Sequence, residues 1–122
     1  MQNSALFRRG IVLPLNDRAE EALRSNDVEK NTIVQHLPIP DDAFFEKLWK
    51  IGIFHEINQR CGSLIDDYEE EFIEVTRIPS LTEAIEKVSG ETTQADLKAF
   101  LTELHKLTTT ASAIKRPVLF LL

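Results

Sequence analysis

The chain has 122 residues, of which 43% are hydrophobic and 28% charged, and its formal net charge is −6. This length fits a single domain, residues 1–122, whose core needs no disulfide or metal, and the hydrophobic content argues against intrinsic disorder. The negative charge disfavours nucleic acid as a ligand, because the phosphates would repel it, and favours a basic protein.

Apolar runs near both ends of the chain predict short strands. Residues 11–13 form one run, limited by Gly10 and Pro14, and residues 118–121 form the other. Short apolar runs with such limits are typical of β-strands, and we expect these two to pair with each other. Residues 32–37 alternate in polarity after a β-branched start, which favours a third strand over a short helix.

Helical periodicity dominates the rest of the chain. Asn16 or Asp17 opens the first predicted helix. A capping pattern stands at the start of each predicted helix: Asp17 with Glu20, Asp41 with Asp42, Ser80 with Glu83, and Thr93 with Asp96. The second of these helices is apolar on nearly all sides and is expected to form the centre of the core. Gly52 should kink or break it, and Gly62 should end it. The prediction is a predominantly helical α+β domain with a small sheet built partly from the N- and C-terminal strands.

The negative charge is concentrated in one third of the chain. Residues 41–74 hold ten acidic and three basic side chains, and between Gly62 and Thr76 there are six carboxylates and no basic residue. A face that serves only solubility usually mixes both signs of charge. The run also contains Tyr68 and Phe72, and aromatic rings among carboxylates suit a partner interface. The alternative is a solvated face with both rings in the core.

The secondary structure of residues 63–78 has two interpretations. In a helix, Leu64, Tyr68, Phe72 and Val75 would share one face and the carboxylates would point outward. Alternatively, Leu64 and Ile65 extend as a loop or strand, and residues 72–78 form a second one. Periodicity alone does not decide between them.

Patterns of catalytic and metal-binding residues are weak. His36, His55 and His105 lie far apart and outside any Glu-x-x-His arrangement, and the single cysteine, Cys61, fits a small buried hydrophobe. There is no nucleophile elbow and no phosphate-binding glycine loop. We therefore expect no catalytic residue, no metal and no cofactor. A carboxylate enzyme is the competing hypothesis, and it would need Asp66 or Glu69 in a deep pocket with a raised pKa.

One part of the chain resembles a known class of proteins. The segments concerned are Phe44–Trp49, Ile51–Phe54, Ile57-Asn58 and Gly62–Glu71. They resemble the small acidic immunity proteins of bacterial toxin–immunity systems, particularly those of contact-dependent growth inhibition, over about residues 41–90. The resemblance implies a cytoplasmic, non-enzymatic protein that binds one cognate toxin domain, often a basic nuclease, and blocks or distorts its active site.

The acidic run and the resemblance together predict where the partner binds. The expected contacts are Asp66, Asp67, Tyr68, Glu69, Glu70, Glu71 and Glu74, followed by Asp41, Asp42 and Glu46. Carboxylates would take the place of phosphates in a basic cleft, and Tyr68 would supply an apolar anchor.

The same patterns lead to expectations about location and assembly. The apolar runs 11–15 and 118–122 are too short for a signal-peptide core or a membrane span, so we expect a cytoplasmic protein without a membrane ligand. By itself the chain would be a monomer or a weak dimer. The alternative function is a small homodimeric adaptor or regulatory subunit with no toxin partner.

Overall fold

A four-stranded antiparallel sheet organises the fold. The computed structural model describes residues 9–29, 32–66 and 70–122. The strands are β1 (Gly10–Pro14), β2 (Val34–Pro38), β3 (Glu70–Ile73) and β4 (Val118–Leu121), in the order β2-β1-β4-β3. The predicted α+β architecture is confirmed, and so is the pairing of the two end strands, which places Val12 opposite Leu119. The third predicted strand, β2, begins two residues later than expected.

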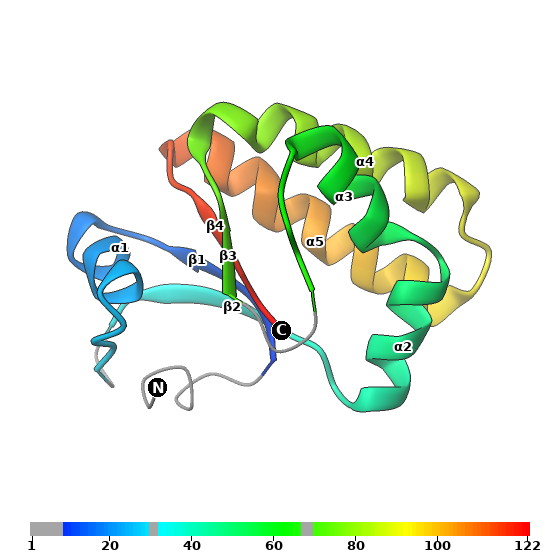
Figure 1. Cartoon of the computed structure of the whole chain (residues 1–122), viewed down its shortest axis with the longest axis horizontal. Helices are drawn as coiled ribbons and strands as arrows, with labels where there is room; N and C mark the ends of the chain where they lie inside the picture. Colours follow the sequence, from blue (N-terminus) through cyan, green and yellow to red (C-terminus); the bar gives the residue numbers. More distant parts are fainter. Residues whose placement is uncertain (1–8, 30–31, 67–69) are drawn as a thin grey trace.

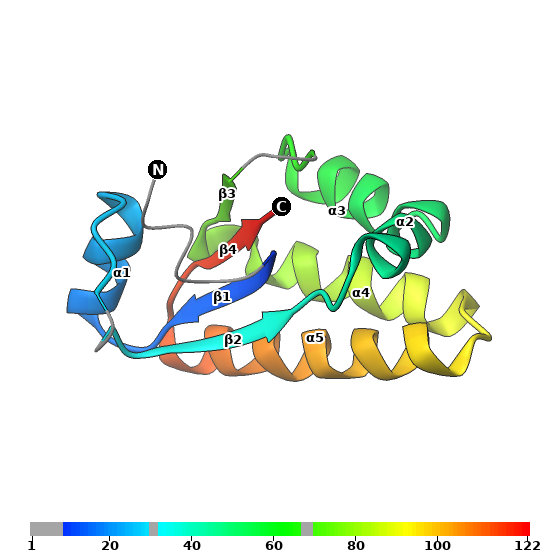
Figure 2. The same cartoon turned by 90° about the horizontal axis from the view of Figure 1, so that it is seen from below.

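Helices pack on both faces of this sheet (Figures 1 and 2). They are α1 (Asp17–Arg24), α2 (Asp42–Lys50), α3 (Ile53–Cys61), α4 (Ile78–Glu91) and α5 (Ala95–Ile114), with a 3₁₀ turn η2 at Val75–Arg77. Side chains alternate across each strand, so Ile11 and Phe120 point to the main core with α3, α4 and α5. Val12 and Leu119 point to the other face, where Leu23 of α1 packs against them. In the described residues, no helix has both the length and the apolar character that crossing a membrane requires.

The helix α5 forms the centre of the main core. The leucine stripe at positions 97, 101, 104 and 107 is buried, as its spacing predicts. The helix ends at Lys115, which has a left-handed φ of 58°. The expected burial of the helix after Asp41 holds for its second half, since α3 buries Ile53, Phe54, Ile57 and Cys61, but not for its first half, since α2 buries only Phe45 and Leu48. Much of the apolar surface of α2 instead lies at the edge of the core, where it borders solvent.

Gly52 breaks the predicted second helix in two. Its φ of 86° is left-handed, and it separates α2 from α3. No atom lies within 4 Å of the place that a Cβ would occupy, so the backbone conformation, and not a lack of space, accounts for the glycine. Gly62 ends α3 with a φ of 66°, as predicted.

The first two helix caps test the sequence patterns. Asn16, and not Asp17, caps α1, because the Asn16 Oδ1 accepts the N–H of Ala19 at 2.7 Å. Asp41 caps α2 as predicted, and its carboxylate accepts the N–H of Phe44 at 2.8 Å. In both cases the residue with extended backbone just before the helix takes the role.

The last two helix starts differ from the predictions. Helix α4 begins at Ile78, two residues before the predicted cap, because η2 leads directly into it. Pro79 fits this first turn, where no intrahelical N–H partner is needed, and Ser80 therefore lies inside the helix. Gln94, one residue after Thr93, precedes α5.

The extended interpretation of the acidic segment is correct for the residues described there. Residues 63–66 have no regular secondary structure and residues 70–73 form β3 on the edge of the sheet. The strand begins two residues earlier than predicted and gives way to η2 after Glu74. The helical interpretation is wrong for these residues, because the backbone of residues 70–73 pairs with β4.

Candidate functional site

The structure divides the predicted acidic surface into several parts. Asp67, Tyr68 and Glu69 lie outside the described residues. Of the other seven residues, Asp42, Glu46 and Asp66 line a single hollow, although α2 and the loop after α3 contribute them separately. Asp41, Glu70, Glu71 and Glu74 are not among its lining residues.

This hollow, the α2 hollow, has a volume of about 550 Å³. It is lined by Arg9, Asp42, Phe45, Glu46, Trp49, Lys50 and Asp66. Helical spacing explains five of these residues, since side chains three or four positions apart on α2 lie next to one another. The spacing places Asp42, Glu46 and Lys50 in one row, and Phe45 with Trp49 in the adjacent row.

Aromatic rings form one wall of the α2 hollow. Phe45 is buried, and its ring centroid lies 6.2 Å from that of the half-buried Trp49. The rings of Phe54 and His55, both on α3, lie 4.8 and 5.3 Å from the Trp49 ring. Contacts on several sides restrict the indole, so this wall presents a fixed aromatic surface.

Arg9 occupies part of the α2 hollow. Its guanidinium carbon lies 4.0 Å from the centroid of the Phe45 ring, and its Nη1 lies 3.3 Å from Asp42 Oδ1. The arginine therefore combines a cation–π contact with an ion pair. Among the described residues, three carboxylates and two basic side chains line the hollow.

Asn58 holds the loop that carries Asp66. Its Oδ1 accepts the backbone N–H of Ile65 at 2.7 Å and the hydroxyl of Ser63 at 2.8 Å. Its Nδ2 donates to the carbonyl oxygen of Ile65 at 3.0 Å. One amide thus satisfies three polar groups and fixes the backbone beside Asp66. The sequence analysis gave Asn58 no role; the available signal was an asparagine in the last helical turn, just before glycine and serine.

Arg77 also holds the turn that follows α3. Its Nη1 donates to the carbonyl oxygen of Cys61, and the Cys61 thiol contacts the Arg77 carbonyl oxygen at 3.8 Å. These contacts join the end of α3 to the start of α4. Burial raises the pKa of the Cys61 thiol, which fits a small buried hydrophobe and not a nucleophile.

The carboxylates of β3 point in different directions. Successive side chains on a strand alternate, so Glu70 shares a face with Phe72, and Glu71 shares the opposite face with Ile73. Glu71 accepts the backbone N–H of Leu64 at 3.3 Å and so braces the loop after α3. Glu70 is exposed and makes no ion pair with any residue in the described ranges.

Glu74 is engaged by an arginine of the chain itself. Its two carboxylate oxygens accept from Arg24 at 2.7 and 3.0 Å. The hydrogen bonds from Arg24 lower the pKa of Glu74. Arg24 also lies 4.6 Å from the Phe72 ring centroid and 3.1 Å from Glu20, so this group holds α1 against β3. A partner would have to displace Arg24 to reach Glu74.

The ion pair of Glu74 predicts a dependence of stability on pH. Its pKa is lower in the folded chain than in the unfolded chain, so its contribution is complete at neutral pH and is lost as the pH falls below about 5. We expect Glu74→Gln to be less stable than the parent chain at pH 7, by no more than about 1 kcal/mol because the pair is half-exposed. Urea denaturation at several pH values should show this difference shrinking towards pH 3. A constant difference would contradict the assignment.

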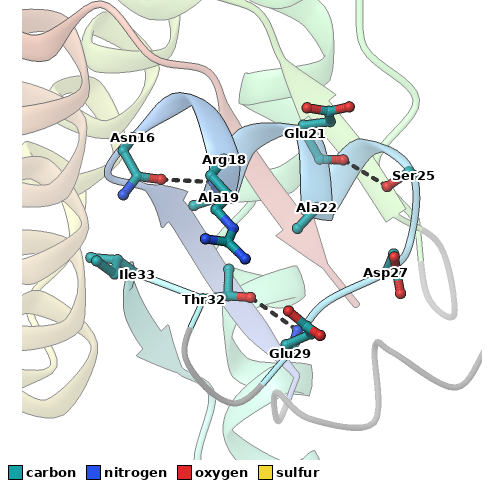
Figure 3. A pocket seen from close by; sticks show the side chains of 10 residues that line it. All are labelled: Asn16, Arg18, Ala19, Glu21, Ala22, Ser25, Asp27, Glu29, Thr32 and Ile33. Atoms are coloured by element: carbon teal, nitrogen blue, oxygen red, sulfur yellow. Dashed lines mark hydrogen bonds between the residues drawn. The ribbon is translucent and has the colours of Figure 1, made fainter.

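A second hollow, of about 580 Å³, lies beside α1 (Figure 3). Several of its polar side chains have local structural roles. Asn16 caps α1, Ser25 donates to the Glu21 carbonyl oxygen at 2.8 Å, and the Thr32 hydroxyl accepts the N–H of Glu29 at 2.9 Å. These bonds shape the helix ends and the turn that follows α1, so local backbone structure accounts for them without a ligand.

Among residues 9–29, 32–66 and 70–122, no three His, Cys, Asp or Glu side chains converge as a metal site requires. His105 pairs with Glu86 at 2.9 Å, on helices away from the acidic segment. Comparison of the chain with protein-family models, with curated proteins and with solved structures finds no match in any of the three.

Proposed function

We propose that this chain is a non-enzymatic immunity protein that binds and neutralises a cognate toxin domain. The observation that carries the proposal is the α2 hollow, where Asp42, Glu46 and Asp66 lie around the aromatic wall of Phe45 and Trp49. Carboxylates beside a partly exposed aromatic ring form a surface suited to the basic face of another protein.

The charge of the surrounding surface supports a basic partner. Two of the three basic side chains in residues 41–74 reach carboxylates outside that range, because Lys47 pairs with Asp96 and Arg60, which also pairs with Glu56, lies 3.5 Å from Glu83. Glu46 and Glu70 make no ion pair within the described residues, so their charge remains unneutralised. A nuclease cleft is positive because it holds phosphates, and opposite potentials speed association to about 10⁸–10⁹ M⁻¹s⁻¹ at low salt.

Ion pairs within the chain keep several other carboxylates ionised. Neighbouring arginine or lysine side chains lower the pKa of Glu56, Glu74 and Asp96. The proposed protein acts from the cytoplasm by binding alone, so it needs no carboxylate that serves as a general acid.

Co-expression tests the proposal. The polypeptide encoded immediately upstream is expressed in a bacterial host, alone and together with this chain. We expect growth arrest alone and growth with the chain present. The double variant Glu46→Lys/Asp66→Lys should lose most of the protection, because reversal replaces attraction to a basic surface with repulsion. The matched control is Glu21→Lys/Glu29→Lys, which reverses two exposed carboxylates near α1.

Each outcome of the co-expression test bears on the proposal. Protection by the parent chain and by the control, with loss in the hollow variant, would support it. An upstream product without toxicity, or a toxic product against which the chain gives no protection, would overturn it. Circular dichroism and urea denaturation of both variants will show that any lost protection does not come from unfolding.

The alternative of a homodimeric adaptor predicts a continuous apolar patch. In the described residues, the large apolar side chains that are exposed are Leu15, Ile33, Leu64, Val75 and Ile114. Leu15 and Ile33 are neighbours, since the N–H of Leu15 donates to the carbonyl oxygen of Ile33 at 3.0 Å, and the other three lie in further segments of the chain. Small groups of exposed apolar residues are ordinary on a protein surface. Light scattering distinguishes the two functions, since the adaptor requires a stable dimer without any partner.

A further inference from the structure

We propose that the outer edge of β3 binds an extended basic segment of the partner protein, which joins the sheet as an additional strand. This inference rests on the proposed function for the identity of the partner as a toxin domain, and it extends that function by naming how the partner is recognised. Three features of the molecule support it: the register of the sheet, the charge along the edge and the apolar side chains beside it.

The register of the sheet shows which strand each backbone group faces. The N–H of Leu15 donates to the carbonyl oxygen of Ile33, and the N–H of Ile39 donates to that of Arg9. Bonded and non-bonded residues alternate along an antiparallel pair. The odd-numbered residues of β1 therefore bond to β2, and its even-numbered residues bond to β4.

The same alternation leaves backbone groups of β3 facing outward. Leu121 bonds to β1, because its partner there is even-numbered, so Phe120 bonds to its partner on β3, which is Glu71. The N–H and C=O groups of Glu70 and Phe72 therefore point away from the sheet, in which β3 is the last strand (Figure 2). In the described residues, no hydrogen bond from another segment reaches them.

The charge along this edge favours a basic segment. Between Gly62 and Thr76 the chain has six carboxylates and no basic residue. Glu70 is exposed on the edge strand itself, and Arg24 of α1, which reaches the same strand, is already bound by two carboxylates of the chain. Like charges on neighbouring strands repel, so a second copy of this acidic strand is disfavoured and a basic strand is favoured.

Apolar side chains lie beside the edge. Leu64 is 76% exposed, and its N–H donates to the carboxylate of Glu71 at 3.3 Å, which places this loop next to β3. Val75 is exposed just after the strand. Side chains of an added strand alternate between its two faces, so a segment in which basic and apolar residues alternate suits both the carboxylates and these apolar groups.

The loop after α3 connects the edge with the α2 hollow. It carries Leu64 beside β3 and Asp66 in the lining of the hollow. Both surfaces thus share one loop, which fits a single partner that covers them together.

Hydrogen exchange of individual amides, followed by NMR, tests the edge directly. In the free chain we expect protected amides at Glu71 and Ile73, which bond to β4, and fast exchange at Phe72. The probe is the peptide acetyl-Lys-Val-Arg-Val-Lys-amide, added in excess to the full chain at low salt. It should slow exchange at Phe72 and leave exchange at the other two amides unchanged.

Two matched peptides separate strand pairing from charge. Proline in place of each valine keeps the charge but prevents pairing along a sheet edge. Glutamate in place of each basic residue keeps the valines but reverses the charge. We expect neither peptide to protect the Phe72 amide.

Substitutions at Glu70 test the edge from the side of the chain. Proline is tolerated where the N–H of an edge strand points outward, so Glu70→Pro should keep the sheet and abolish protection of Phe72 by the probe. Glu70→Gln keeps the N–H and should weaken binding about two- to fivefold, the usual range for one exposed ion pair. Glu21→Gln, an exposed carboxylate on α1, is the matched control and should leave binding unchanged. If urea denaturation shows Glu70→Pro to be unfolded, the three peptides decide.

The outcomes separate this inference from the proposed function. Protection of Phe72 by the valine peptide alone would support the edge even if the upstream product is not toxic. No protection by that peptide, or equal protection by the proline peptide, would overturn the edge even if the chain protects against a toxin. A Phe72 amide already protected in the free chain would overturn it too, because the chain itself would then occupy the edge.

Discussion

Replacing Gly10 with alanine is expected to lower the free energy of unfolding by about 3 kcal/mol. A Cβ at this position would lie 2.9 Å from the Cα of Pro38, and closer still to the carbonyl oxygen of Leu37. Both atoms belong to the backbone of β2, which cannot rotate away as a side chain would. Because β1 pairs with β2 on one side and with β4 on the other, moving it would disturb the centre of the sheet.

Urea denaturation of Gly10→Ala measures this effect, with Gly90→Ala as the matched control. Gly90 lies inside α4, and no atom lies within 4 Å of the place of its Cβ. Alanine is favoured over glycine in a helix interior by about 1 kcal/mol, so the control should raise the free energy of unfolding. Equal effects of the two substitutions would show that the close approach of β1 and β2 at Gly10 is not a constraint.

Replacing Asn58 with alanine is expected to release the loop at residues 63–66 and to cost about 2 kcal/mol of unfolding free energy. The substitution removes three hydrogen bonds and leaves the N–H and the carbonyl oxygen of Ile65 without these partners. Ile65 is only 3% exposed, so water has little access to the groups left behind. Asp66 would then lose its fixed position beside α2.

Hydrogen exchange of the Ile65 amide measures the release of the loop, and urea denaturation measures the loss of unfolding free energy. The matched control is Gln59→Ala, an exposed neighbour of Asn58 on α3. Exchange at Ile65 should be much faster in Asn58→Ala and unchanged in the control. The hydrogen-bond assignment would be contradicted if the amide stayed protected in Asn58→Ala.

Features with a local cause could be predicted from the sequence. Gly52 breaks a helical pattern because one residue needs a left-handed backbone, and that requirement is visible in the residue type. The strand at residues 118–121 is apolar throughout because both of its faces are buried. The start of α4 was displaced because η2 leads directly into it, and the N-cap positions of α4 and α5 carry no side-chain cap hydrogen bond that a sequence pattern could reveal.

The acidic segment could not be resolved because its conformation is decided by distant groups. Residues 70–73 become a strand because β4 offers a partner nearly fifty residues later in the chain. Residues 63–66 follow the amide of Asn58, which lies in a different element. The residues of this segment do have helical periodicity, but pairing with the sheet makes residues 70–73 a strand.

The grouping of the candidate-site residues could not be predicted from the sequence either. The sequence placed Asp42, Glu46 and Asp66 among the expected contacts, yet gave no reason to group them. Their convergence depends on the break at Gly52 and on the loop held by Asn58. Trp49 belongs to the helix that was expected to form the centre of the core, and it is in fact a half-buried wall of the hollow. On an otherwise apolar helix, residue spacing alone cannot distinguish a partly exposed aromatic side chain from one that is buried in the core.

The position of β4 inside the sheet has a consequence for biosynthesis. This strand joins β1 to β3, and its partners in β1 lie more than one hundred residues earlier in the chain. Until residues 118–121 leave the ribosome, the β2-β1 pair and β3 lack the strand that lies between them. Contacts so remote in sequence slow the search for the native topology. Assembly of the sheet must therefore wait for residues 118–121, and no nascent fragment that lacks them can present the finished sheet.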